Sequence, residues 1–424
     1  MPYLTIQGEK KKIPPFPHHK NYVYRCYRFF EVKNLFSFLT VNGLFRIPRE
    51  ILLSRKYKAM IPRDLLIDPT SACNLKCTGC WAADYKKNSN LSYEKLDEIF
   101  TDAKKMGVMD ILMSGGEPLM RKDDIIKLCR KHNKLNFGMF TNATLIDEAF
   151  ADEMVKLGNL NAFVSIEGFE EETDFRRGKG TYNKVLNAMR IMKERDIGFG
   201  FSACYHSKNY KTIASDAFLD FIREQGAWFG WLFNYFPIGS DADLSLCTSP
   251  DQRSFVMQKI DAYSKKNRFT IIDFANSGHK AIGCVAAGND FAHINSNGDL
   301  EPCAFCHYSD VNINEVSFHE ALRSPFFTKF RQTKPFSDNY LRPCPMIDVP
   351  DALAEVTTNP EVKSTHLRNP ESGVEMAEKT RLIAEKWKDK ADVLYADMPA
   401  REKRRFGLLT RVLLSGNKKN STKY

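Results

Sequence analysis

Cys73-Asn-Leu-Lys-Cys77-Thr-Gly-Cys80 brings three cysteines together in one short loop, at C-x3-C-x2-C spacing. The residues before it, Asp64-Leu-Leu-Ile-Asp68, are typical of a short buried strand, and residues 69–72 lead out of that strand. Because iron-sulfur clusters are usually held by four cysteine thiolates, three in one loop predict a 4Fe-4S cluster with one iron open for chemistry. We therefore expect a ligand site beyond the carboxyl end of a strand, where α/β enzymes bind their ligands.

Strand and helix patterns alternate through the region that begins with this loop. Apolar runs predict strands at Asp64–Asp68, Met109–Met113, Asn136–Phe140, Ala162–Ile166, Gly198–Ala203 and Trp228–Tyr235. Helical spacing predicts helices at Tyr93–Met106, Lys122–His132, Asp147–Leu157, Tyr182–Arg195 and Lys211–Gln225. Because the two patterns alternate, we expect an α/β fold with a parallel sheet and right-handed crossovers.

Three further motifs follow the next predicted strands in order. They are Ser114-Gly115-Gly116-Glu117-Pro118, Thr141-Asn142-Ala143-Thr144-Leu145 and Val164-Ser165-Ile166-Glu167-Gly168. Together with the cysteine loop they resemble the radical S-adenosylmethionine (radical SAM) superfamily, whose GGEP, TNG-type and VSIDG motifs they match, with Ala143 in place of Gly and Glu167 in place of Asp. The resemblance spans residues 63–239 and implies a partial (β/α)6 TIM-like barrel. Taken alone, the cysteine spacing is also compatible with a zinc site or with unrelated thiols.

The resemblance implies a complete set of cofactor-binding residues. Cys73, Cys77 and Cys80 would hold the 4Fe-4S cluster, whose open iron binds SAM; reductive cleavage then gives a 5'-deoxyadenosyl radical that abstracts hydrogen from the substrate. The residues expected to bind or orient SAM are Gly115, Gly116, Glu117, Pro118, Asn142, Ser165 and Glu167. An electron donor such as flavodoxin or ferredoxin is implied as a partner, and no further catalytic residue is assigned.

A second group of cysteines follows the predicted barrel. Cys284, Cys303, Cys306 and Cys344 surround an Asn297-Gly298 dipeptide, which is a strong hairpin signal between Ile294 and Leu300. The spacing resembles the opening of SPASM and twitch domains, which implies a small C-terminal cysteine-rich α+β auxiliary-cluster domain. Four cysteines can complete one auxiliary 4Fe-4S cluster, so these four are the expected ligands.

Other metal sites fit the same segment. Four cysteines, or three with a histidine, also suit structural zinc, and Cys303-Ala-Phe-Cys306-His307 formally matches a c-type haem attachment site. We expect no signal peptide on this chain, which disfavours haem attachment. If all four cysteines are ligands, we expect His293 and His307 to be hydrogen-bonding or exposed residues.

These patterns divide the chain into four parts. We expect a basic, aromatic-rich segment at 1–62, the radical SAM barrel at 63–240, the auxiliary-cluster domain at 241–353, and a C-terminal part at 354–424. Within the last part we expect a surface linker at 354–372, a charged helix at Glu375–Asp392 with Met376, Leu382, Ile383 and Trp387 on its apolar side, and a basic amphipathic tail.

Positive charge is concentrated at the two ends of the chain. Residues 1–63 hold 13 Lys and Arg against three acidic residues, and residues 401–424 hold eight against one, so the ends carry +10 and +7 while the whole chain carries only +10. The longest uncharged N-terminal run, 34–45, is too short to span a bilayer. Basic, aromatic and apolar residues together predict peripheral contact with an anionic membrane, whereas the alternative is packing on the barrel exterior. We do not expect nucleic acid as a partner, because no nucleic-acid-binding module is recognisable.

The substrate is left open by these patterns. The basic ends favour a lipid or another membrane-associated substrate for a cytoplasmic enzyme on the inner membrane face. The resemblance to auxiliary-cluster enzymes equally allows a peptide or protein maturase, of the kind that modifies ribosomal peptides or sulfatases. A noncatalytic metal-binding scaffold is the third hypothesis.

Overall fold

The computed structural model describes residues 3–6, 9–12, 47–82, 89–108, 110–281 and 283–399. Most of the basic N-terminal segment and the whole basic tail at 401–424 lie outside these residues, so the expected membrane contacts of both ends fall outside the description. None of the described helices is long and apolar enough to cross a membrane. A short antiparallel pair, β1 (Tyr3–Ile6) and β2 (Glu9–Lys12), and helix α3 (Ile47–Tyr57) precede the barrel.

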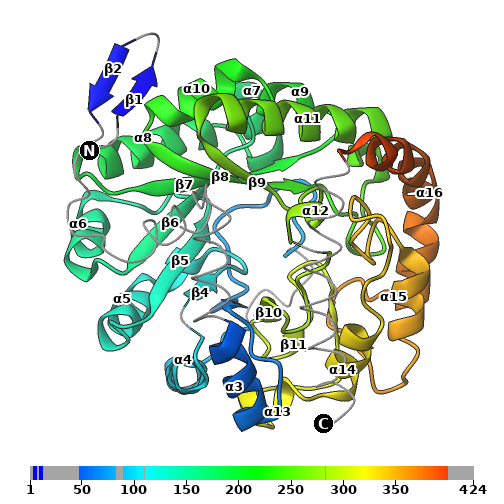
Figure 1. The fold of residues 1–424 in the computed structure, drawn as a ribbon. Helices are drawn as coiled ribbons and strands as arrows, with labels where there is room; N and C mark the ends of the chain where they lie inside the picture. The colour runs from blue at the N-terminus through cyan, green and yellow to red at the C-terminus, as the bar shows by residue number, and fades with distance from the viewer. Residues whose placement is uncertain are drawn as a thin grey trace.

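The six predicted strands form one parallel sheet that curves around a central axis (Figure 1). They are β3 (Asp64–Ile67), β4 (Asp110–Met113), β5 (Asn136–Thr141), β6 (Leu160–Ser165), β7 (Phe199–Tyr205) and β8 (Ala227–Asn234). Each pairs with its neighbour in sequence, as in Ile67 opposite Met113 and Met113 opposite Met139. The carboxyl ends of all six strands therefore meet at one edge, and the α/β prediction is confirmed.

The sheet continues beyond the six predicted strands. Strand β9 (Thr270–Asp273) pairs with β8, and β10 (Phe291–Ile294) pairs in parallel with β3, so the sheet has nine strands in the order β11-β10-β3-β4-β5-β6-β7-β8-β9. Strand β11 (Leu300–Glu301) returns from β10 through the predicted Asn297-Gly298 turn, in which Gly298 has φ +94°. The cysteine-rich segment thus joins the edge of the barrel sheet and does not stand apart from it.

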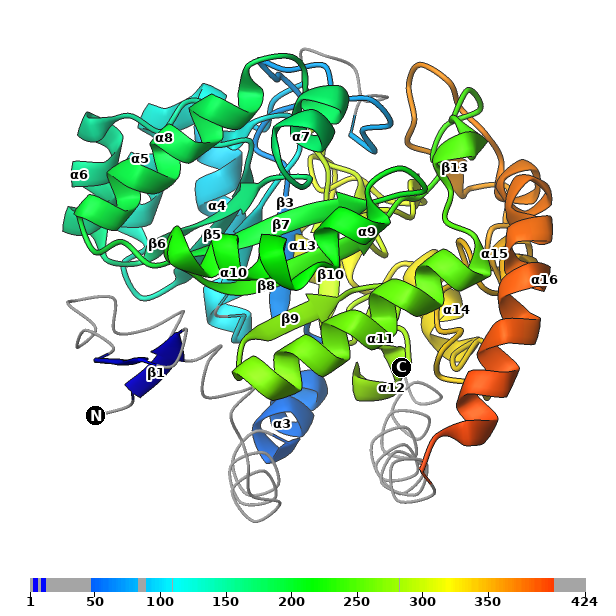
Figure 2. The ribbon, with the colours of Figure 1, turned by 90° about the horizontal axis from the view of Figure 1, so that it is seen from above.

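Helices cover the convex face of this sheet (Figure 2). They are α4 (Tyr93–Met106), α5 (Lys122–Lys131), α6 (Glu148–Leu157), α7 (Glu170–Arg177), α8 (Thr181–Glu194), α9 (Tyr210–Ile213), α10 (Asp216–Glu224) and α11 (Pro250–Asn267). The helix expected at Lys211–Gln225 is broken, because the Ser215 hydroxyl accepts a hydrogen bond from Phe218 N and starts a new helix. Helices α7 and α11 were not expected from the sequence.

The C-terminal part packs against the barrel more closely than expected. It contains α12 (Gly278–Ala281), β12 (Tyr308–Ser309), α13 (Phe318–Ala321), α14 (Pro325–Gln332), α15 (Pro350–Val356), β13 (Lys363–Ser364) and α16 (Gly373–Asp397). The prediction of a surface linker at 354–372 is wrong in part, since Thr365, His366 and Glu371 are buried. On α16, Trp387 is buried as expected. Leu382, which was expected on the same apolar side, is 59% exposed.

Candidate functional site

The three cysteines of the first loop lie just past the carboxyl end of β3, as the sequence predicts. Burial is the largest of the causes that raise the pKa of Cys73 to about 11; the charges of Glu117, Cys80 and Cys77 add to this rise, and a hydrogen bond from Leu75 N to its Sγ at 3.4 Å opposes it. Three thiols within one eight-residue loop next to a sheet edge fit a site for one cluster.

The glycines of the second motif hold the base of the cysteine loop. Gly116 N donates to Thr70 O at 2.9 Å, and Glu117 N donates to Ala72 O at 2.8 Å. Gly115 has φ +99°, and a Cβ atom on Gly116 would lie 2.2 Å from Ala72 O. Only glycine allows this approach of two backbones. The two glycines therefore position the cysteine loop as well as any ligand that it holds.

Replacing Gly116 by Ala is expected to displace the cysteine loop, because the new Cβ would collide with backbone and not with a flexible side chain. We expect the cluster on Cys73, Cys77 and Cys80 to be lost, so that total iron falls from about eight to about four atoms per chain. Gly198→Ala is the matched control, since its Cβ would meet only Trp228 atoms at 3.5 Å or more. Iron and labile sulfide analysis after anaerobic reconstitution measures the effect; full iron in Gly116→Ala would contradict it.

Glu117 links the second motif to the end of β5. Its carboxylate accepts hydrogen bonds from Leu119 N at 3.1 Å, Thr141 Oγ1 at 2.7 Å and Asn142 N at 2.7 Å. Burial raises the pKa of Glu117, although these three hydrogen bonds oppose the shift. Pro118 starts the 3-10 turn η2 (Pro118–Arg121) and is buried. The Glu117 side chain thus already has three donors within the protein.

Asn142 connects the third motif back to the cysteine loop. Its Nδ2 donates to Asn74 Oδ1 at 2.8 Å, and its Oδ1 accepts from Thr144 N at 3.0 Å. Ala143, which stands where the resemblance has Gly, adopts φ +60°. The glycine-like backbone is therefore kept at this strand end although the residue differs.

Glu167 and Ser165 lie at the end of β6. The fully buried Glu167 carboxylate pairs with Arg176 Nη1 at 2.7 Å and Arg177 Nη2 at 2.5 Å, and accepts from Cys204 N at 2.7 Å. Burial alone would raise the pKa of Glu167, but the two guanidinium groups outweigh it and lower that pKa. The Ser165 hydroxyl lies 3.2 Å from that of Ser202.

Sequence reasoning missed the two arginines of α7. Arg176 O accepts a hydrogen bond from Thr78 N at 2.8 Å, and Arg176 Nη2 donates to Gly79 O at 3.4 Å. Burial and Cys77 raise the pKa of Cys80, whereas the charge of Arg176 lowers it. The arginines thus supply positive charge beside the thiols, held in place by Glu167. The adjacent Arg-Arg pair after the fourth motif was the available signal.

The four cysteines of the second group also come together. Burial raises the pKa of Cys306, and the charges of Cys303, Cys344 and Cys284 raise it further. Cys306 N donates to Cys303 O at 2.9 Å, and Cys284 lines a small pocket with the buried Lys334. Among the described residues, no three His, Cys, Asp or Glu side chains surround a position for a single metal ion. Four mutually close thiols are the donor set that a 4Fe-4S cluster requires.

His293 connects the cysteine-rich segment to the barrel through buried charges. Its Nε2 lies 3.0 Å from Asp68 Oδ2 and its Nδ1 lies 2.6 Å from Glu301 Oε2, with all three side chains fully buried. Burial disfavours the imidazolium, but the two carboxylates raise the pKa of His293 to about 10. The expectation that His293 and His307 could be exposed is wrong, because both side chains are buried. His307 packs edge-on against His366, with ring centroids 4.2 Å apart.

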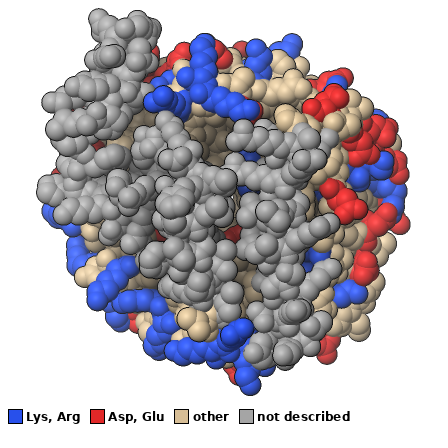
Figure 3. All heavy atoms as spheres, in the orientation of Figure 1, with Lys and Arg blue, Asp and Glu red and all other residues tan. Residues whose placement is uncertain are grey.

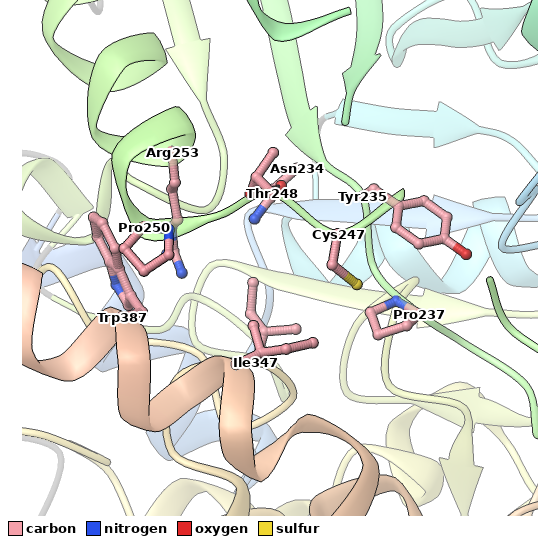
Figure 4. Close-up of a pocket in the computed structure, with 10 residues that line it drawn as sticks. Asn234, Tyr235, Pro237, Cys247, Thr248, Pro250, Arg253, Ile347 and Trp387 are labelled. Carbon is pink, nitrogen blue, oxygen red and sulfur yellow. Dashed lines mark hydrogen bonds between the residues drawn. The ribbon is translucent and has the colours of Figure 1, made fainter. Parts of the chain in front are cut away.

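A pocket opens at the carboxyl end of β8, between α11 and α16 (Figure 4). Asn234, Cys247 and Trp387 are among its lining residues. Arg253, which also lines it, pairs with Asp348 at 2.6 Å and lies 4.1 Å from the Trp387 ring centroid. The Arg253 guanidinium is already paired with Asp348 and stacked on Trp387, so we interpret this pocket as a gap in side-chain packing and not as a ligand site.

Comparison with known proteins agrees with both cysteine groups. The model of the radical SAM superfamily matches residues 67–218, and the model of SPASM, an iron-sulfur cluster-binding domain, matches residues 284–346. The Fe-coproporphyrin III synthase of Methanosarcina barkeri is 30% identical over 42% of this chain and 45% of its own length. The PqqA peptide cyclase of Gluconobacter oxydans is 24% identical over 64% of this chain and 80% of its own.

Solved structures show the same fold. Streptococcus suis SuiB bound to its precursor peptide SuiA is similar with a TM-score of 0.55 and 19% identity, over 70% of this chain and 71% of that one. This chain spans less than half the length of some of the relatives that it matches. The two family matches cover both cysteine groups, and the chain therefore carries a radical SAM superfamily domain at residues 67–218 and a SPASM iron-sulfur cluster-binding domain at residues 284–346.

Proposed function

We propose that this enzyme cleaves SAM to form a 5'-deoxyadenosyl radical and uses it to abstract hydrogen from a lipid or another membrane-associated substrate. The observation that carries the first half is the cysteine loop at the carboxyl edge of the barrel, whose base at Thr70 and Ala72 accepts hydrogen bonds from Gly116 N and Glu117 N. The second half rests on the charge of the chain ends.

The residues present fit the two cofactors. The first three thiols would hold the SAM-binding cluster, which with SAM supplies one-electron cleavage of a sulfonium bond when both are bound. Glu117 and Asn142 fix the loop that carries the thiols through their hydrogen bonds. Arg176 and Arg177 place buried positive charge beside the thiols, which favours their anionic form.

The lipid reading follows from how charge is distributed along the chain. The two basic ends carry +10 and +7, so the remainder of the chain must carry −7. On the face shown in Figure 3, acidic side chains gather along the edge where α15 and α16 lie in Figure 1, and basic side chains lie elsewhere on the rim. Each Lys or Arg close to an anionic leaflet contributes about 1 kcal/mol, so such ends would hold the enzyme near its substrate.

This charge distribution predicts binding to anionic vesicles at low salt. The protein is expected to co-sediment with phosphatidylglycerol vesicles but not with phosphatidylcholine vesicles, and deleting residues 401–424 should weaken binding at least about tenfold. Binding should also fall as salt screens the charges. Equal sedimentation with both vesicles, or none with either, would overturn the membrane half and leave SAM cleavage untouched.

A peptide substrate is the second candidate, because the PqqA peptide cyclase resembles 64% of this chain over 80% of its own length. Under this reading the chain would be a maturase of a ribosomally made peptide. A short precursor gene beside the gene for this chain would favour it, whereas neighbouring lipid-synthesis genes would favour the lipid substrate. A flavodoxin or ferredoxin is the proposed electron donor in either case.

A further inference from the structure

Aromatic side chains cover the concave face of the barrel sheet, away from the helices. Phe140, Phe163, Phe229 and Trp231 belong to an apolar cluster distinct from the main core, which lies between the sheet and the helices, whereas Phe233 and Phe305 pack with that main core. We call the following six residues the aromatic wall: Phe140, Phe163, Phe229, Trp231, Phe233 and Phe305. The ring centroids of Phe140 and Phe163 are 4.9 Å apart, and those of Phe140 and Trp231 are 5.5 Å apart. The rings therefore form one continuous surface.

The aromatic wall extends to both groups of cysteines. Phe233 contacts Phe305 with ring centroids 5.8 Å apart, and Phe305 lies between Cys303 and Cys306 in the sequence. Phe305 in turn contacts Trp81 at 5.9 Å, and Trp81 directly follows Cys80. An apolar surface thus connects the SAM-binding site to the auxiliary-cluster site.

Several rings of the aromatic wall keep accessible surface inside the barrel. Phe140, Trp231 and Phe233 are half-buried, whereas Phe163 is fully buried beneath them. Accessible aromatic surface in a concave site is what apolar ligands use. These three side chains are therefore free to contact a ligand without displacing the core.

The aromatic wall itself offers few polar partners, because five of its six side chains are phenylalanine. The hydroxyls of Ser165 and Ser202 lie within hydrogen-bonding distance of each other, and His293 is held between Asp68 and Glu301. An extended peptide would need backbone donors and acceptors along its path. A hydrocarbon chain needs none, and it gains from burial against the rings.

We propose that the aromatic wall binds an acyl or prenyl chain of the substrate between the two cysteine sites, with Phe140, Trp231 and Phe233 as its specificity-determining residues. This inference rests on the proposed function, which supplies the radical chemistry. It deepens that function, because it assigns the hydrocarbon part of the substrate to named side chains.

Equilibrium dialysis of the reconstituted enzyme against radiolabelled palmitate tests the proposal. We expect saturable binding of one palmitate per chain, weakened at least about tenfold by Phe233→Asn, because a polar side chain then faces the hydrocarbon. Leu382→Asn is the matched control, since Leu382 is an exposed apolar residue on α16. Phe140→Asn repeats the test on strand β5. Measurements of the iron content and of the unfolding midpoint verify that each variant is folded.

The outcomes separate this inference from the proposed function. Absence of saturable palmitate binding, or equal affinity in Phe233→Asn and Leu382→Asn, would overturn the aromatic wall as a chain site even if 5'-deoxyadenosine is formed. A leucine-rich peptide that binds with the same Phe233 dependence while palmitate does not would also overturn it. Failure to form 5'-deoxyadenosine from SAM, with palmitate binding intact, would instead refute the radical chemistry.

Discussion

Changing Cys73, Cys77 and Cys80 together to Ala is expected to reduce 5'-deoxyadenosine formation to the background of a cluster-free sample. These are the thiols that meet at the carboxyl end of β3, and each acts electrostatically on its neighbours. Without them, the cluster whose open iron would bind SAM has no protein ligands, so the loss should be complete and not partial. Quantification of 5'-deoxyadenosine by chromatography after anaerobic reduction with dithionite measures the effect.

Iron content gives the same variant a second readout. About four iron atoms should remain, held by Cys284, Cys303, Cys306 and Cys344. The control is Cys129→Ala with Cys247→Ala, because neither cysteine belongs to the two groups; this variant should keep about eight. Zinc in place of the residual iron, no residual iron, or continued SAM cleavage would contradict the assignment of the two sites.

Local pattern was sufficient to predict the barrel strands. All six expected strands exist within two residues of their predicted ends, because each is a short apolar run whose residues are mostly buried. Helix α4 begins and ends at the predicted residues, since Ser92 caps its start and Gly107, at φ +95°, ends it. These signals lie within a few residues of the element that they define.

The contacts missed by sequence reasoning join residues far apart in the chain. Strand β10 pairs with β3 across more than two hundred residues, and neither strand carries a sign of its partner. Arg176 reaches the cysteine loop only because α7 follows β6 at the same edge. The role of Gly116 was only partly foreseen, because its crowding comes from Ala72 backbone and not from a ligand alone.

The buried charges at His293 lead to the second large effect that we expect. His293→Leu should destabilise the protein by about 3–5 kcal/mol, because it leaves Asp68 and Glu301 buried without their shared cation. In a triple variant, Asp68→Asn and Glu301→Gln are combined with His293→Leu. This neutral variant should recover much of the lost stability, since no unpaired charge remains. Urea unfolding followed by circular dichroism measures both, and equal midpoints for the two variants would show that charge is not the cause.

The same network predicts how stability depends on pH. His293 has a folded-state pKa of about 10, above its ordinary value of 6.5, so its stabilising charge is fully present below about pH 6.5 and is lost as the pH rises toward 10. Burial also raises the pKa values of Asp68 and Glu301, although His293 opposes both shifts, so their contributions change in the same direction. The wild-type protein should therefore lose stability relative to the neutral triple variant between pH 6.5 and pH 10. A constant difference across that range would mean that His293 is neutral in the folded protein and that the link between β3 and β10 is an ordinary hydrogen bond.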